Sequence, residues 1–338
     1  MNSIHDIRGF SNETPHDNPP VILVDGKNDF QDAKLRSIAV SKAFQTDCKY
    51  WVGRSERMFE CGSTLQFAVS NTGERRLYKA NFCRDRLCPA CQKRRSLVVF
   101  HQVKNVCSAI STDFPTYKYV LLTLTVPNVP VADLPPKITD MSKAWGRLVK
   151  RKEFSTAVKG WFRTLEITYN AKQDTYHPHY HVLLCVPSGY FKNYYIKQSR
   201  WLELWQESMK DHSITQIDVR VIKPNPNRKG TDAISSAAAE VGKYATKPSD
   251  YLDRVPNSKE RYIASKKIVR DLAVAIRGRK LVAFGGLMLT YSKLLDQQDV
   301  DSDSVDLIHT DGDSEQIDAV ITQIYRWNIG LNNYVCKG

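Results

Sequence analysis

The sequence contains no apolar run long enough to cross a membrane, and nothing near its start has the pattern of a signal peptide. It also lacks a G-x₄-G-K-[ST] phosphate-binding loop, because neither Gly26-Lys27 nor Gly242-Lys243 has a glycine five positions earlier. These absences predict a cytoplasmic protein without an ATPase site. Its eight cysteines are therefore expected to be free or metal-bound rather than paired in disulfides.

Charge is distributed unevenly along the chain. Lys and Arg outnumber Asp and Glu by 49 to 36, which gives a net charge of +13. Nine of the acidic residues fall within 296–319, a stretch with no Lys or Arg, so the rest of the chain is more basic still. Such a charge favours a polyanionic partner, most simply nucleic acid. A chain of 338 residues can form one large or two modest domains.

Three histidines alternate in the stretch Y-H-P-H-Y-H-V-L-L-C-V at 176–186, which has the apolar tail of a buried strand. Side chains on a strand point to alternate faces, so His179 and His181 share one face and could bind one metal ion. The alternative is a half-buried strand with solvated imidazoles. The pattern H-x-H followed by V-L-L favours a metal site.

A third ligand is expected from the strand at 162–169, where Glu166 shares a face with Thr164 and Thr168. The intervening loop at 170–174 is short enough for antiparallel pairing with the histidine strand. A dinuclear hydrolase would need an Asp after His181, and none follows. We therefore expect one ion on two histidines and one carboxylate, a ligand set that accepts Mn²⁺ or Mg²⁺.

Cysteines form a second cluster upstream. The pair Cys88-Pro-Ala-Cys91 presents two sulfurs to one ion, and Cys83 and Cys61 would complete a structural Cys₄ zinc site. Buried reduced thiols, a redox pair and a catalytic thiol are alternatives. The basic residues around the cluster favour a zinc-stabilised element that faces DNA; those predicted to bind it are Arg84, Arg86, Arg94 and Arg95.

A third pattern lies at 232–248, which has helical spacing. On that helix Glu240, Lys243, Tyr244 and Lys247 would share a polar face. The alternative is a solvated helix side with a tyrosine at its rim. Together with a nearby metal ion, the tyrosine could attack a phosphodiester, and the two lysines could neutralise the phosphate and lower the phenol pKa.

In combination, the segments 121–128 (L-L-T-L-T-V-P-N), 177–184 (H-P-H-Y-H-V-L-L) and 240–247 (E-V-G-K-Y-A-T-K) resemble the motifs of a known family. With the cysteine block, they are similar to the replication initiator (Rep) proteins of rolling-circle plasmids, the single-tyrosine branch of the HUH endonuclease superfamily. The resemblance spans 61–247.

The resemblance implies an enzyme that nicks a plasmid double-strand origin. Tyr244 would hold the 5′-phosphate and leave a 3′-OH for the host polymerase, while a host helicase unwinds the duplex. His179 and His181 would be the HUH pair around Tyr180. His177 is the second choice, because a proline at position 178 is disfavoured in mid-strand.

No second tyrosine stands one helical turn from Tyr244; Glu240 occupies that place and is predicted to act as general base on water. A conjugative relaxase or a single-Tyr transposase would use the same chemistry. A zinc-containing DNA-binding protein without catalysis is an alternative of another class. A small-molecule metallohydrolase is disfavoured by the charge.

The predicted fold is α+β, with a central antiparallel sheet (an HUH or ferredoxin-like core), helices on one face and a preceding zinc-binding element. The predicted segments are a tail and short helix (1–50), the Cys₄ element with a helix (51–115), the catalytic domain (116–270) and a C-terminal segment (271–338). Its acidic stretch, 296–319, is expected to be a linker rather than a cover over the basic surface. The oligomeric state stays open, with a homodimer among the options.

Overall fold

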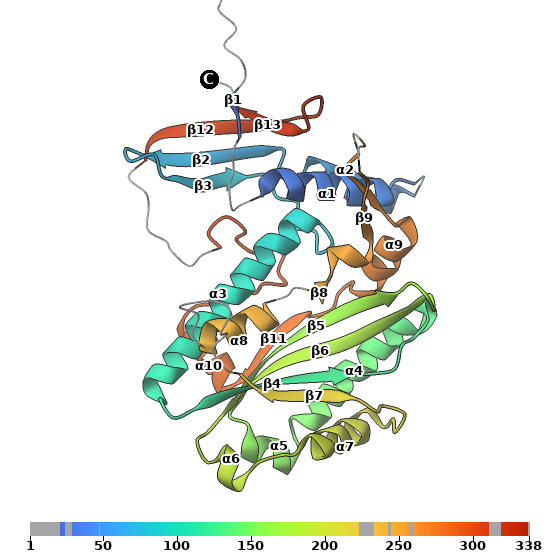
Figure 1. The fold of residues 1–338 in the computed structure, drawn as a ribbon, viewed down its shortest axis with the longest axis vertical. Coiled ribbons are helices and arrows are strands. Elements are labelled where there is room, and N and C mark those ends of the chain that lie inside the picture. The colour runs from blue at the N-terminus through green and yellow to red at the C-terminus, as the bar shows by residue number, and fades with distance from the viewer. Residues whose placement is uncertain are drawn as a thin grey trace, which may run out of the picture.

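The structure is a computed structural model that describes residues 21–23, 29–46, 48–222, 233–242, 245–256, 258, 260–310 and 319–336. Of the three sheets in the described residues, the two larger ones have largely antiparallel pairing and lie at opposite ends of the molecule, with helices packed between and around them (Figure 1). This arrangement confirms the predicted α+β fold. Within the described residues, no helix is long and apolar enough to span a membrane.

The larger sheet has six strands in the order β11-β5-β6-β4-β7, with β8 also paired to β5. These strands are β4 (Lys118–Thr125), β5 (Gly160–Asn170), β6 (Thr175–Val186), β7 (Ile217–Val221), β8 (Ala245–Thr246) and β11 (Val282–Gly286). All pairs are antiparallel except β5 with β8. The predicted antiparallel pairing of the strand at 162–169 with the histidine strand, now seen as β5 and β6, is confirmed.

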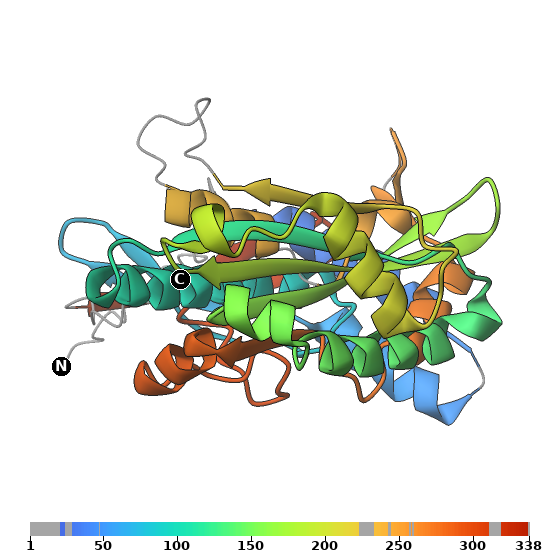
Figure 2. The same cartoon turned by 90° about the horizontal axis from the view of Figure 1, so that it is seen from below.

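Aromatic side chains fix helices to one face of this sheet. Tyr180 of β6 packs edge-on against Trp145 of α4 (Leu134–Leu148) and Trp205 of α7 (Gln198–Met209). Trp201 and Trp205 are fully buried. Figure 2 shows α4 and α7 lying along the sheet, with the short helices α5 (Lys152–Ala157) and α6 (Tyr190–Asn193) near them.

The opposite face is covered in part by α8 (Ala233–Val241). The side chain of Arg220 on β7 contacts that of Glu240 on α8. In the sheet, Arg220 pairs with Leu121 of β4. Leu121 shares a face of β4 with Thr123, two residues on, and Thr123 pairs with His181. Directly paired residues point the same way, so α8 lies on the histidine-bearing face. The prediction of helices on one face alone is therefore wrong.

The smaller sheet joins the two ends of the described chain in the order β1-β13-β12-β2-β3. Its strands are β1 (Val21–Ile22), β2 (Thr64–Ser70), β3 (Arg75–Ala80), β12 (Ala319–Asn328) and β13 (Asn333–Cys336). Phe67 of β2 packs between Phe30 and Tyr325 of β12. The sheet thus combines residues from three of the four predicted segments, whose boundaries stay a prediction.

Helices α1 (Phe30–Ala43) and α2 (Lys49–Glu60) lie beside this sheet, and α3 (Pro89–Asp113) runs from it toward the larger sheet (Figure 1). The remaining elements are η1 (Val131–Asp133), η2 (Pro248–Asp250), β9 (Leu252–Arg254), β10 (Tyr262–Ala264), α9 (Lys266–Ala275) and α10 (Leu287–Leu294). One hydrophobic core of the described residues runs from α1 and α3 into the six-stranded sheet. The helices beside the five-stranded sheet and the six-stranded sheet therefore pack as one body.

Candidate active site

The three predicted metal ligands meet on one face of the larger sheet. Glu166 of β5 pairs directly with His179 of β6, and Thr164 pairs with His181. Glu166 Oε2 lies 2.8 Å from His181 Nε2 and 3.4 Å from His179 Nε2. Cis ligands of one ion at about 2.1 Å are about 3 Å apart, so the spacing suits a shared cation. We call Glu166, His179 and His181 the metal triad.

Backbone and side-chain contacts orient both imidazoles. His179 Nδ1 lies 3.2 Å from the carbonyl oxygen of His177, which can accept a hydrogen bond from Nδ1–H. His181 Nδ1 lies 3.4 Å from Thr123 Oγ1 on β4. Such second contacts hold a ligand ring in place and fix its tautomer. Thr123 was not predicted as a site residue, although it lies in the L-L-T-L-T-V-P-N motif.

Glu166 is held as a carboxylate. Its side chain is only 4% exposed, and burial by itself would raise the pKa. Hydrogen bonds from His179, His181 and Lys247 outweigh that effect and keep the pKa well below its usual range. Lys247 Nζ lies 3.0 Å from Glu166 Oε1, so this predicted DNA-binding lysine reaches the metal triad.

His177 lies beside the triad, outside its ligand set. Its ring stacks on that of His179 at a centroid distance of 5.3 Å. Burial, and to a smaller extent the charge of His179, lowers the pKa of His177.

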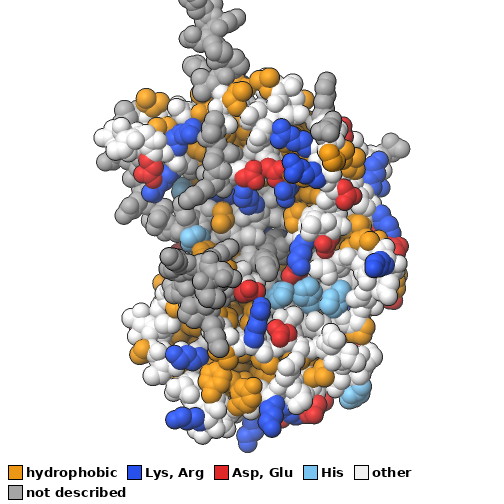
Figure 3. Space-filling model, viewed as in Figure 1, with side chains coloured by type: hydrophobic (Ala, Val, Ile, Leu, Met, Phe, Trp, Pro, Cys, Tyr) orange, Lys and Arg blue, Asp and Glu red, His pale blue; other side chains and the backbone are white. Residues whose placement is uncertain are grey.

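Pro178 does lie within β6, paired with Ile167 of β5. The pairing of β6 with β4 ends at His179, so Pro178 lies just outside it. The strand therefore tolerates the backbone N–H that proline lacks, because no β4 residue is paired with that position. In Figure 3, pale-blue histidine side chains form a patch on one face of the molecule.

The predicted helix at 232–248 is shorter than expected. It ends at Val241, and Ala245 and Thr246 form β8, parallel to β5. Gly242 lies close to both α8 and α3, since a Cβ there would lie 2.8 Å from the carbonyl oxygen of Ala238 in α8 and 3.5 Å from Phe100 Cβ in α3. The prediction that Lys247 shares a helical face with Glu240 is therefore wrong. Lys243 and Tyr244 lie outside the described residues. Ala245, next in sequence, pairs with Glu166.

Glu240 lies on the same sheet face as the metal triad. Its Oε2 is 3.2 Å from an Arg220 guanidinium nitrogen, and its side chain is 43% exposed. The ion pair with Arg220 was not predicted, because nothing in the local sequence links β7 to α8. Its role as a general base stays a prediction.

The four predicted zinc ligands form a compact cysteine cluster: Cys61, Cys83, Cys88 and Cys91. Cys61 Sγ lies 3.5 Å from the sulfurs of Cys88 and Cys91, and Cys83 Sγ lies 3.7 Å from that of Cys91. Sulfurs at tetrahedral corners around zinc are about 3.8 Å apart, so the spacing fits one ion.

Hydrogen bonds to the cysteine cluster favour thiolate character at Cys88. Burial opposes ionisation of this thiol, but contacts with the other cysteines and with Ser37 lower its pKa, while the pKa values of Cys83 and Cys91 are raised. Cys88 also caps α3, whose first residue is Pro89. The N-terminal end of a helix stabilises a nearby negative charge, so the fold suits a thiolate at this position.

Much of the acidic stretch packs on the protein. In its described part, 296–310, Val305 and Leu307 are 1% exposed, and Asp301 accepts hydrogen bonds from the backbone N–H groups of Leu281 and Val282. The linker interpretation is therefore wrong for these residues. Residues 311–318 lie outside the described chain.

This segment binds the predicted DNA-facing arginines through its carbonyl oxygens. Arg94 donates to Leu307 and Ile308. Arg84 donates to Val305, and Arg86 to Asp301. Arg95 is fully buried against Val300 and Ser302, so its predicted contact with DNA is wrong. The other three keep some exposure, and their DNA contacts stay predictions.

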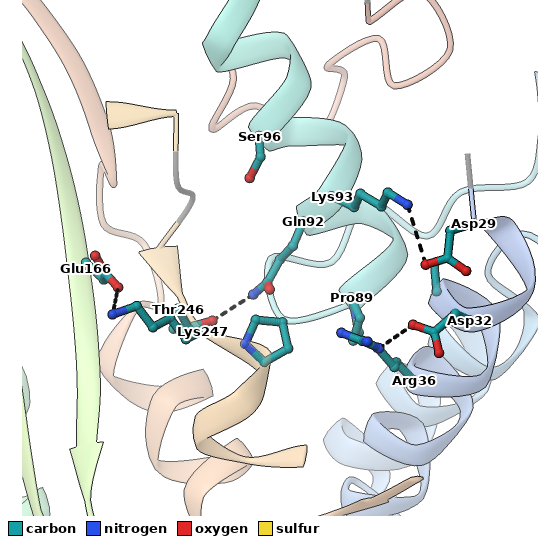
Figure 4. Close-up of a pocket in the computed structure, with 12 residues that line it drawn as sticks. Asp29, Asp32, Arg36, Pro89, Gln92, Lys93, Ser96, Glu166, Thr246 and Lys247 are labelled. Carbon is teal, nitrogen blue, oxygen red and sulfur yellow. Dashed lines mark hydrogen bonds and ion pairs between the residues drawn. The ribbon is translucent and has the colours of Figure 1, made fainter. Parts of the chain in front are cut away.

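Gln92, which was not singled out from the sequence, links the cysteine cluster to the metal triad. Its Nε2 donates to the carbonyl of Arg86 and to Thr246 Oγ1, both at 2.8 Å. Thr246 lies in β8, against the strand that carries Glu166. Figure 4 shows Gln92 reaching from α3 toward Thr246.

Sequence comparisons agree with the motifs. The profile of a family described as "Replication protein" matches residues 74–335. The chain belongs to this family. Protein rep of Streptococcus pneumoniae serotype 2 (strain D39 / NCTC 7466) is 31% identical over 329 residues, covering 95% of this chain and 97% of the relative. This confirms the resemblance to Rep proteins of plasmid replication initiation.

Two further relatives place the chain in the same Rep family. Protein rep of Lentilactobacillus hilgardii is 34% identical, covering 83% of this chain and 87% of the relative. A protein rep of Staphylococcus aureus is 36% identical, covering 63% and 91%. No solved structure significantly matches the chain.

Proposed function

We propose that this Rep-family protein nicks and rejoins one strand of a plasmid double-strand origin during rolling-circle replication. The observation that carries the proposal is the metal triad, in which a carboxylate oxygen faces the Nε2 atoms of two histidines. It lies beside β8, whose first residue follows Tyr244 in the sequence. Membership of the Rep family supports a replication role over a relaxase or transposase.

The ligand chemistry fits two kinds of ion. Glu166, His179 and His181 would hold Mn²⁺ or Mg²⁺, and the cysteine cluster would hold structural Zn²⁺. A divalent ion at the metal triad supplies charge stabilisation to a bound phosphodiester. Thr123 and the carbonyl of His177 hold the two imidazoles in position.

Tyr244 is the nucleophile in this proposal. Its phenolic oxygen gives up its proton and attacks phosphorus, the bond from phosphorus to the 3′ oxygen breaks, and that oxygen takes up a proton to become the 3′-OH primer. The 5′-phosphate stays on the tyrosine as an ester, which conserves the free energy needed for rejoining without ATP. Lys247, with its Nζ at the Glu166 carboxylate, and Lys243 would neutralise the phosphate.

Glu240 would act as the base that activates water and ends the cycle by hydrolysis. Its position on the metal-bearing face, beside Arg220, supports this role. The host would supply the polymerase that extends the primer and the helicase that unwinds the duplex, in the bacterial cytoplasm. Glu240→Ala should still nick and form the adduct but should fail to terminate; a variant equally dead in nicking would contradict the assignment.

The test is incubation with a single-stranded origin oligonucleotide, with and without Mn²⁺. We expect a protein–DNA adduct that resists denaturation, requires the metal and disappears in Tyr244→Phe. Tyr251→Phe is the matched control, because Tyr251 is buried against Gln92. Specific binding without any adduct would instead support the zinc-containing DNA-binding protein.

A further inference from the structure

A cavity of about 410 Å³ opens directly beside the metal triad. Glu166 and Lys247 form its inner end, and the first turns of α1 and α3 form its far walls (Figure 4). Its volume lies in the range of small-molecule binding sites and is sufficient for one nucleotide. None of the sequence motifs pointed to it, since its walls come from segments more than 200 residues apart.

Charges of both signs line this cavity. Arg36 and Asp32 of α1 form an ion pair at 2.6 Å, and Lys93 of α3 lies 3.9 Å from Asp29. Lys247 stands at the opposite end, on the Glu166 carboxylate. Arg36 and Lys93 are thus paired with the aspartates of the far wall, and Lys247 is the lysine beside the metal triad that could meet the phosphates of a strand passing over the opening.

The two aspartates decide which part of a nucleotide enters. Asp29 and Asp32 accept hydrogen bonds only, and they already engage Arg36 and Lys93, the cations of this wall that could otherwise bind a phosphate. The exocyclic amino groups of nucleobases are donors, so a base edge suits this wall and a phosphate does not. Ala33, Pro89 and Pro248 supply apolar surface for the ring faces.

We propose that this cavity binds the base of one nucleotide next to the cleaved phosphate, with the backbone held at the metal triad. The base is turned out of its stack, as an unpaired strand permits. Ser96 lies on α3 in the cavity wall, where a larger side chain would fill the space (Figure 4). This inference rests on the proposed function in one respect, namely that a single strand lies across the metal triad.

The experiment measures binding of origin oligonucleotides to the full chain without added Mn²⁺ or Mg²⁺, so that no cleavage is required. Single abasic sites are scanned across the nick region. In the wild type, one position next to the nick should weaken binding about 5- to 100-fold, as expected for the loss of one bound base. Neighbouring positions should change it much less.

Ser96→Trp should weaken binding of the intact oligonucleotide and remove the penalty of that one abasic site. Ser108→Trp is the matched control, an exposed serine of the same helix outside the cavity, and should keep the wild-type profile. An unchanged penalty in Ser96→Trp, or a flat profile in the wild type, would overturn the proposal.

A second measurement needs no variant. With 2-aminopurine at the sensitive position, binding should raise its fluorescence at least about twofold, because a base removed from its stack is less quenched; equal rises at all positions would contradict the cavity. A position-specific penalty together with no covalent adduct would retain the cavity and reject the nicking proposal.

Discussion

Glu166 and His179 lie directly opposite each other on β5 and β6, with the carboxylate 3.4 Å from the imidazole Nε2. Two neighbouring strands therefore bring the metal triad together without any loop. A site built on paired strands is held by the ladder of backbone hydrogen bonds and is rigid.

Removal of the carboxylate charge should abolish metal binding. We expect Glu166→Gln to weaken Mn²⁺ affinity, measured by calorimetry, by more than about 100-fold, because an amide is a poor ligand for a hard cation. Thr168→Ala, two residues along the same face of β5, is the control and should bind Mn²⁺ normally. Full Mn²⁺ binding by Glu166→Gln would contradict the ligand assignment.

His177 should matter less than its neighbours. It contacts His179 by ring stacking, and the contact that orients His179 Nδ1 comes from its backbone carbonyl, which a substitution leaves in place. We therefore expect His177→Ala to weaken Mn²⁺ binding less than about tenfold, and His179→Ala and His181→Ala far more. Equal losses in all three variants would make His177 a ligand.

The cysteine cluster should carry one zinc ion per chain. Cys88→Ser should lose that zinc and lower the melting temperature by about 10 °C or more, because the cluster anchors the start of α3. Cys48→Ser, at an exposed cysteine, should change neither. Mass spectrometry measures the zinc content of each variant, and thermal unfolding measures its melting temperature. A wild-type protein that is stable without zinc would refute the zinc site.

Asp301 should be important for stability. It is buried and accepts from two backbone N–H groups, those of Leu281 at 2.7 Å and Val282 at 3.0 Å. Asp301→Ala leaves both donors without this partner and should reduce the free energy of unfolding by about 2–4 kcal/mol in urea titrations. Asp303→Ala, at an exposed aspartate nearby, should cost less than about 0.5 kcal/mol.

Acid should loosen the segment at 296–310. Burial would raise the pKa of Asp306, but hydrogen bonds from Ile308 and His309 lower it below its ordinary 3.8. This carboxylate therefore stabilises the fold above about pH 4, and the contribution disappears as the pH falls through its folded pKa.

The effect should be at most about 1 kcal/mol, because the Asp306 side chain is 44% exposed and water screens its charge. Asp306→Asn should be less stable than the wild type at pH 7, and the difference should shrink toward pH 3 in urea titrations. A difference independent of pH would exclude this carboxylate as the cause.

The local sequence determined the metal triad and the cysteine cluster. Alternation with a period of two puts His179 and His181 on one face, and a short loop forces β5 and β6 into antiparallel register, which brings in Glu166. The close spacing of Cys83, Cys88 and Cys91 limits how far apart their sulfurs can lie. Apart from Cys61, the residues of both features lie near one another in the sequence.

Only the tertiary structure decided where the helix at 233–241 ends and what the arginines contact. Helical spacing continues past Val241, but β5 offers an unpaired backbone edge, and pairing of Ala245 with Glu166 replaces the helix there. Arg95 is buried because carbonyl groups of Val300 and Ser302, about 200 residues away, accept its hydrogen bonds. Contacts between segments so far apart leave no periodic signal in the sequence, since each depends on the folded positions of both partners.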